Sequence, residues 1–93
     1  MRNTRQLQAE IAALEGFRVR VTRRGPTGPM GRLRAYPYTR SAKGTYSVAA
    51  WTANRFEATY PQCAVEVLDP AGRPVHGRTL LSNLRERYFA LQH

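Results

Sequence analysis

The chain has 93 residues, with fifteen basic and six acidic side chains and a formal net charge of +9. This length predicts one compact domain over residues 1–93, and Cys63, as the only cysteine, excludes an intrachain disulfide and a cysteine-based zinc cage. No apolar run approaches the ~20 residues of a membrane span, so we expect neither secretion nor membrane insertion and place the protein in the cytoplasm.

The first predicted element is a helix over residues 3–15. Leu7, Ile11 and Leu14 recur at i, i+4 and i+7, which gives the helix one narrow apolar stripe. Asn3 with Gln6 forms a capping-box pair, and Gly16 supplies a C-terminal stop.

A strand is predicted next, because apolar Phe17, Val19 and Val21 alternate with the polar residues between them. Its wet face carries Arg18 and Arg20, so it is cationic. Three glycines and two prolines then predict a mobile, arm-like loop at about residues 24–31.

Residues 32–40 also show a period of two, which predicts a second basic strand. One side would carry the polar and aromatic residues, and Pro37 would confine the strand to a sheet edge. The side chains expected on that side are Arg32, Arg34, Tyr36, Tyr38 and Arg40.

Three further elements are predicted in the second half of the chain. A helix capped by Thr45 or Ser47 runs to a stop before Pro61; a strand from Tyr46 is the alternative, but length and alanine content favour the helix. Residues 63–68 alternate as a strand that enters a turn at residues 69–72. A final helix begins at about Thr79, and its apolar face is expected to carry Leu80, Leu81, Leu84, Tyr88 and Leu91.

The elements together predict a small α+β domain in the order α-β-β-α-β-α. The sheet would have about three short antiparallel strands, with the helices packed on one face and the other face free.

The basic charge lies almost entirely in the first half of the chain. Residues 1–46 hold ten basic and two acidic side chains, whereas residues 47–93 hold five and four. Fourteen of the fifteen cations are arginines, whose planar donors suit phosphate and which also stack on rings. We therefore expect a non-enzymatic protein that binds RNA or DNA, with arginines on phosphates and tyrosines on bases. The expected binding residues are Arg18, Arg20, Arg23, Arg24, Arg32, Arg34, Tyr36, Tyr38, Arg40 and Lys43.

Two alternatives remain open for these residues. The tyrosines can instead belong to the core, with the arginines meeting water. The same face can also serve a small inhibitor or adaptor that docks on an acidic protein surface, since arginine and tyrosine are common interface residues. Phe89 and Leu91 on the last helix offer a homodimer contact.

Little in the sequence indicates catalysis, a metal or a cofactor. Cys63, His76 and His93 lie at no spacing typical of a nucleophilic pair or a metal site. Gly25, Gly28 and Gly31 are separated by prolines and lack the lysine of a phosphate-binding loop. We expect no enzyme activity, no metal and no cofactor.

Overall fold

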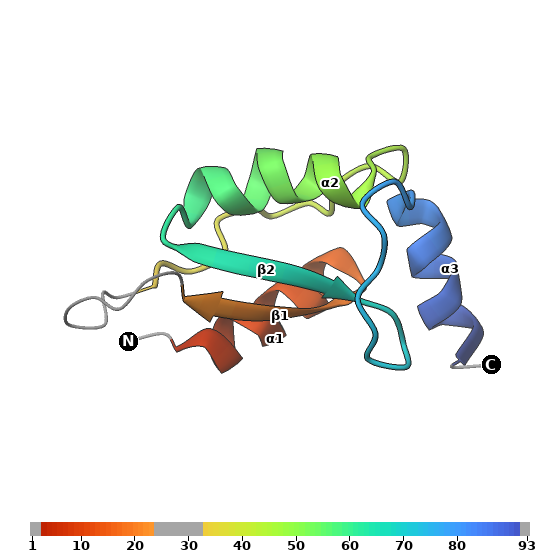
Figure 1. Cartoon of the computed structure of the whole chain (residues 1–93), viewed down its shortest axis with the longest axis horizontal. Helices are drawn as coiled ribbons and strands as arrows, with labels where there is room; N and C mark the ends of the chain where they lie inside the picture. Colours follow the sequence, from red (N-terminus) through yellow and green to blue (C-terminus); the bar gives the residue numbers. More distant parts are fainter. Residues whose placement is uncertain (1–2, 24–32, 92–93) are drawn as a thin grey trace.

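The computed structural model describes residues 3–23 and 33–91. It shows a small α+β domain with helices at both ends and a two-stranded sheet (Figure 1). In chain order the elements are α1 (Thr4–Glu15), β1 (Arg18–Arg23), α2 (Val48–Trp51), the π-helix η1 (Thr52–Glu57), β2 (Cys63–Leu68) and α3 (Leu81–Leu91). The loop predicted at residues 24–31 lies outside the described residues. Within the described ranges, no helix has the length and apolar character needed to traverse a lipid bilayer.

Helix α1 forms as its sequence predicts. The Asn3 side chain accepts a hydrogen bond from Gln6 N–H at 2.8 Å, and the Gln6 side chain accepts one from Asn3 N–H at 3.0 Å. Gly16 ends the helix in the left-handed region at φ 85°, where a side chain would be strained. The local signals at both ends therefore define this helix.

Strands β1 and β2 pair antiparallel, with Arg18 opposite Leu68 and Arg23 opposite Cys63. Val19 and Val21 are buried, while Arg18 and Arg20 point outward, as the alternation predicts. The Val21 N–H donates to the Gln8 side chain at 2.8 Å, so α1 covers the outer edge of β1. The prediction of about three strands is not confirmed: the described residues form a sheet of two.

The segment predicted as a second basic strand, described here from residue 33, has no regular structure between residues 34 and 38. Pro37 has no N–H to offer a sheet, and the Tyr36 N–H donates to a Glu10 carboxylate oxygen on α1 at 3.1 Å. Leu33 and Tyr36 are buried, a spacing of three that breaks the expected alternation. The segment is an irregular connection attached to α1.

Ser47 caps the N-terminus of helix α2, since its side chain accepts from Ala50 N–H at 3.1 Å, and the helix continues directly into η1. The helix prediction for this region is confirmed, but the wider π-helical turns of η1 were not predicted. The strand predicted at residues 63–68 and its turn are also confirmed: Gly72 adopts φ 86°, and its N–H donates to Asp69 O at 2.9 Å.

The first turns of α2 and α3 are joined by backbone hydrogen bonds. Val48 N–H donates to Thr79 O at 2.8 Å and Ala49 N–H to Gly77 O at 2.9 Å, just before α3. In return, Leu81 N–H donates to Tyr46 O at 2.8 Å and Ser82 N–H to Gly44 O at 3.0 Å, just before α2. Each helix thus satisfies two of its N-terminal donors with the segment that precedes the other. We call this exchange the helix clasp.

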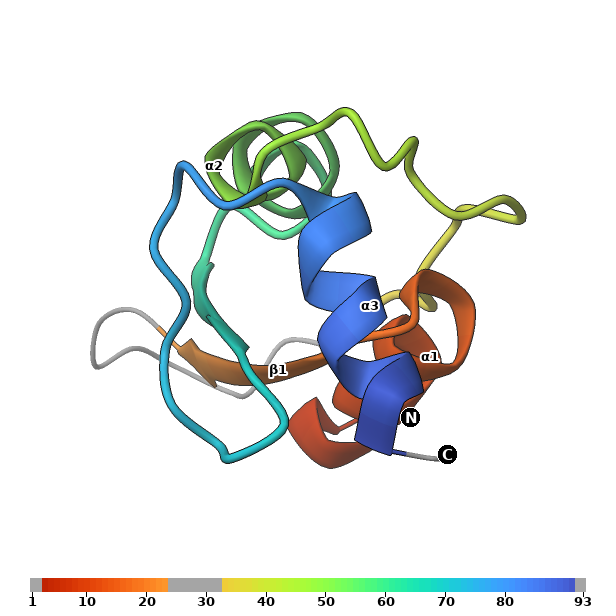
Figure 2. The ribbon, with the colours of Figure 1, turned by 90° about the vertical axis from the view of Figure 1, so that its right-hand side faces the viewer.

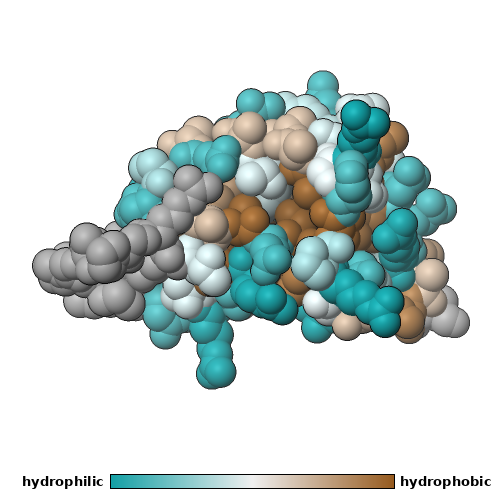
Figure 3. All heavy atoms as spheres, in the orientation of Figure 1, coloured by the Kyte–Doolittle hydropathy of each residue, from teal (hydrophilic) through white to brown (hydrophobic). Residues whose placement is uncertain are grey.

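One hydrophobic core lies between the sheet and the helices (Figure 2). Its fully buried aromatic side chains are Phe17, Trp51, Phe56 and Tyr60, and α1 and α3 contribute Leu7, Ile11, Leu81 and Leu84. Leu80 and Leu91, predicted on the buried face of the last helix, are 40% and 71% exposed. Figure 3 shows hydrophilic side chains over much of the surface and apolar ones gathered between α2 and the strands.

Candidate nucleic-acid interface

The expected binding residues of β1 lie on the outer face of the sheet. Arg18 and Arg20 are exposed, and Arg20 forms an ion pair with Glu66 on β2 at 3.1 Å. Arg18 donates from Nη2 to Pro70 O at 2.8 Å. Arg23 ends the strand, while Arg24 and Arg32 lie outside the described residues.

A second set of expected residues lies on the irregular segment of residues 33–43. Arg34, Arg40 and Lys43 are all exposed there. In the described part of the chain, none of these three cations forms an ion pair. We refer to Arg34, Arg40 and Lys43 together as the basic strap.

Helix α1 separates β1 from the basic strap. Gln8 on α1 bonds to β1, whereas Glu10 bonds to the irregular segment at Tyr36. Two residues correspond to about 200° around an α-helix, so these contacts lie on opposite flanks of α1. Figure 2 shows the strands toward the left of the molecule and residues 33–43 toward the right. Among the described residues of the expected face, those on β1 and those of the basic strap therefore lie on opposite flanks of α1.

The expectation that Tyr36 lies on an exposed face is wrong. Only 8% of Tyr36 is exposed, and its hydroxyl donates to a Glu15 carboxylate oxygen at 2.5 Å while accepting from Trp51 Nε1 at 3.2 Å. Tyr38 is half-buried, and the Arg55 guanidinium lies 4.2 Å from its ring centroid. The two rings therefore contribute to packing within the domain, and they do not form an exposed pair on which bases could stack.

Glu15, which no sequence motif marked as functional, is the centre of a buried polar network. Its side chain is 0% exposed and pairs with Arg55 at 2.8 Å and Arg85 at 3.0 Å. It also accepts from Ala42 N–H at 2.8 Å. The network therefore connects α1 with the irregular segment, η1 and α3.

The same two arginines anchor the backbone of the irregular segment. Arg55 donates to Arg40 O at 2.7 Å, and Arg85 donates to Ala42 O at 2.7 Å. At the other end of the segment, the Tyr60 hydroxyl donates to Arg34 O at 3.0 Å. Side chains thus replace the sheet ladder that this segment lacks, and they fix the backbone beneath the basic strap.

The network shifts two proton equilibria. Burial raises the pKa of Tyr36 well above its usual range, and the Glu15 carboxylate raises it further, because both disfavour the phenolate. Burial by itself lowers the pKa of Arg55, but the hydrogen bond with Tyr36 and the charge of Glu15 outweigh it, so the pKa rises. Tyr36 is therefore neutral and Arg55 charged over the physiological range.

One sequence signal could have revealed the network. Glu15 stands four residues after Ile11 and eight after Leu7, which places it on the buried stripe of α1. A carboxylate on such a stripe needs cationic partners. The sequence offers no comparable signal for Arg55, because its position depends on the π-helical turns of η1.

No protein-family model, no curated protein and no solved structure matches this chain.

Of the residues considered for catalysis, Cys63 and His76 are described and His93 lies outside the described residues. Cys63 is buried at the start of β2, and His76 accepts at Nδ1 from Arg78 N–H at 3.1 Å. Across residues 3–23 and 33–91, no three His, Cys, Asp or Glu side chains are grouped as metal ligands would be.

Proposed function

We propose that the protein binds nucleic acid through the basic strap, with Arg34, Arg40 and Lys43 on backbone phosphates. The observation that carries this proposal is an anchored segment with three exposed cations and no carboxylate paired to them in the described residues. A phosphate backbone supplies the missing negative charge, and neutralising it releases condensed counterions.

The anchored backbone of the irregular segment supports the proposal because it lowers the entropic cost of binding. The backbone carbonyls of Arg34 and Arg40 and both backbone polar groups of Ala42 are held by buried or half-buried side chains. A segment held in this way loses less conformational freedom on contact than a mobile loop would.

The proposed binding mode relies on phosphate contacts, whereas the sequence predicted phosphate contacts together with base stacking. Since Tyr36 is buried and Arg55 covers one face of Tyr38, phosphate contacts rather than base stacking carry the affinity. Such contacts carry no sequence information and are common to RNA and DNA. We also expect contributions from the arginines that stand in the sequence between the middle of β1 and the basic strap: Arg23, Arg24 and Arg32. We propose no catalytic step or cofactor and place the protein in the cytoplasm, where its single cysteine remains reduced.

The test is fluorescence anisotropy with labelled single-stranded RNA, single-stranded DNA and duplex DNA, each at about 50 and about 300 mM salt. The variant is Arg34→Gln with Arg40→Gln and Lys43→Gln. We expect its affinity at low salt to fall roughly 10- to 100-fold. The salt slope should become shallower by about one for each phosphate that the variant no longer neutralises.

The matched control removes three exposed cations that lie after β2, outside the basic strap: Arg73→Gln, Arg78→Gln and Arg87→Gln. Both variants lose the same net charge, so general attraction to a polyanion falls equally in the two. The proposal requires the control to stay within a few-fold of the wild type. Equal weakening in the two variants, or a wild type that binds none of the three probes at low salt, would reject it. The latter result would favour the acidic protein partner.

A further inference from the structure

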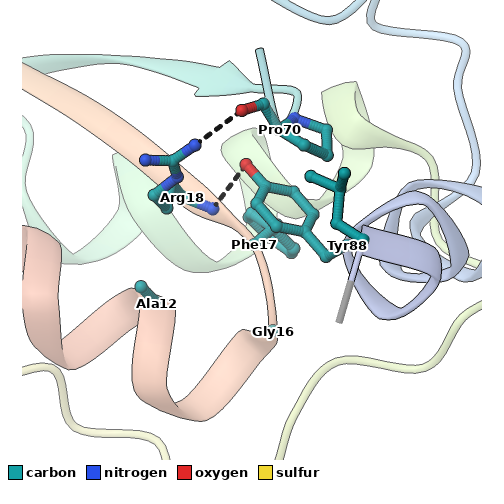
Figure 4. Close-up of a pocket in the computed structure, with 7 residues that line it drawn as sticks. Ala12, Gly16, Phe17, Arg18, Pro70 and Tyr88 are labelled. Carbon is teal, nitrogen blue, oxygen red and sulfur yellow. Dashed lines mark hydrogen bonds between the residues drawn. The ribbon is translucent and has the colours of Figure 1, made fainter. Parts of the chain in front are cut away.

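A second surface, on the flank of α1 opposite the basic strap, contains two adjoining hollows. The first, of about 340 Å³, lies among the end of α1, the start of β1, the turn after β2 and the end of α3 (Figure 4). The second, of about 330 Å³, lies between α1 and the sheet. Ala12 and Arg18 line both hollows, so the two form one groove.

The groove is lined mostly by apolar residues, and its charged members are two cations. Its remaining lining is Gln8, Ala9, Gly16, Phe17, Val19, Leu68, Pro70, Tyr88 and Leu91, with Arg5 at one end and Arg18 where the hollows meet. Among the residues that the structure describes, no carboxylate lines either hollow. The surface is therefore complementary to a ligand that is apolar and negatively charged.

Arg18 is held in place at the junction of the hollows. Its Nη2 donates to Pro70 O at 2.8 Å, and its guanidinium carbon lies 5.9 Å from the centroid of the Tyr88 ring. The Tyr88 hydroxyl, in turn, accepts from Arg18 N–H at 3.1 Å and donates to Leu68 O at 2.5 Å. A guanidinium has five N–H donors, so several remain for a ligand, in an orientation already set by Pro70 and Tyr88.

We propose that this groove binds an acidic, apolar peptide segment of a protein partner. A carboxylate of the segment pairs with Arg18, and apolar side chains on either side of that carboxylate fill the two hollows. Charge complementarity and apolar lining together identify this occupant.

Charge also argues against two other occupants. A second copy of this chain carries +9 itself, and Glu15, one of its six carboxylates, is buried. A nucleic acid would lay several phosphates along a groove that offers two cations and an apolar floor. The proposal is independent of nucleic-acid binding, because none of its residues belongs to the basic strap.

The test uses fluorescein-labelled peptides in which one glutamate stands between two leucines, with spacers of one, two or three serines on each side. A matched set replaces the glutamate with glutamine. We expect at least one glutamate peptide to bind, and its glutamine counterpart to bind about tenfold more weakly, which corresponds to one charge-assisted contact. Arg18→Gln should remove this preference, whereas Arg73→Gln, an exposed arginine outside the groove, should keep it.

Arg18→Gln also removes the bond to Pro70, so a second pair of variants changes the groove without touching Arg18. Ala12→Glu places a carboxylate in the wall shared by the two hollows, and Ala12→Gln adds a side chain of the same size without charge. We expect the glutamate peptides to bind Ala12→Glu at least tenfold more weakly than Ala12→Gln.

Three results would overturn the proposal. They are no binding by any glutamate peptide at millimolar concentration, equal binding by the two Ala12 variants, and displacement of a bound peptide by single-stranded DNA. The last would assign the groove to nucleic acid. The variant of the basic strap must leave peptide binding unchanged, so failure here is distinguishable from failure of the proposed function.

Discussion

The Glu15 side chain makes long-range contacts with four residues: Tyr36, Ala42, Arg55 and Arg85. It is completely buried, and its two arginine partners are only 17% and 24% exposed in their side chains. When one member of such a buried group is removed, the remaining charges have no counter-charge inside the protein, which typically costs 3–5 kcal/mol.

Glu15→Gln should therefore lower the free energy of unfolding by about 3 kcal/mol or more. Urea denaturation followed by tryptophan fluorescence measures this, because Trp51 is buried beside Tyr36. The control is Glu66→Gln, which breaks an exposed pair and should cost less than about 1 kcal/mol. Similar destabilisation in the two variants would contradict the assigned role of Glu15.

Tyr36 makes the free energy of unfolding depend on pH in the alkaline range. Its pKa is raised in the folded protein, whereas in the unfolded chain it should lie near the ordinary value of about 10. The folded state therefore retains the phenol proton more tightly. The stability that this contributes is complete below pH ~10 and is lost as the pH rises from there toward the raised pKa.

Tyr36→Phe provides the comparison. Between about pH 9 and about pH 11, the free energy of unfolding of the wild type should fall more steeply than that of the variant. The two proteins differ only in the Tyr36 hydroxyl, so the difference between the two curves isolates Tyr36. Parallel curves would show that Tyr36 ionises as readily when folded as when unfolded.

At the scale of elements, the helix clasp depends on a close approach between Gly44 and the first turn of α3. A β-carbon at Gly44 would lie 2.8 Å from Ser82 Cβ and 3.3 Å from Ser82 Cα, both below normal contact. The Gly44 carbonyl accepts the Ser82 N–H at the same point. Only glycine leaves room for this hydrogen bond.

Gly44→Ala should push α3 away and destabilise the fold by about 1–3 kcal/mol. Hydrogen exchange should show faster exchange at the Leu81 and Ser82 amides, which the clasp protects. Gly72→Ala is the control, because a β-carbon there meets nothing within 4 Å, although its φ of 86° strains the turn. Unchanged exchange at Leu81 and Ser82 in Gly44→Ala would refute this account of the clasp.

Elements whose signals are local were predictable from the sequence. Asn3, Gln6 and Gly16 define α1 within a few residues of its ends, and the alternation in β1 correctly distinguished its buried face from its exposed face. The irregular segment was not predictable in this way. Its alternation suggests a strand, but its backbone is held by Glu10, Glu15 and Arg55, which are distant in sequence.

The candidate site was predictable in composition but not in arrangement. The excess of arginine over carboxylate is plain in the sequence, and the exposed positions of Arg18, Arg34 and Arg40 agree with it. Two facts required tertiary structure: Tyr36 faces Glu15, and α1 lies between β1 and the basic strap. The periodicity of apolar residues predicts which face of a single element is buried, but it does not predict how the elements are arranged relative to one another.

For the whole molecule, the two flanks of α1 have different chemistry. One bears cations on an anchored irregular segment, and the other bears an apolar groove with Arg18 at its middle. If both proposals hold, a single small domain can hold a nucleic acid and a protein segment at once, without competition between them. The low number of carboxylates serves both surfaces, since it leaves the cations available.

The helix clasp also affects the order in which tertiary contacts can form while the chain is being synthesised on the ribosome. The first-turn donors of α2 find their acceptors at Gly77 and Thr79, and Glu15 obtains its second arginine at Arg85. The chain must therefore have been synthesised as far as Arg85 before Glu15 reaches its last ion-pair partner. A nascent chain that stalls before residue 77 would lack the core residues Leu81 and Leu84 and the acceptors of the α2 donors, so its core would stay incomplete until synthesis resumed.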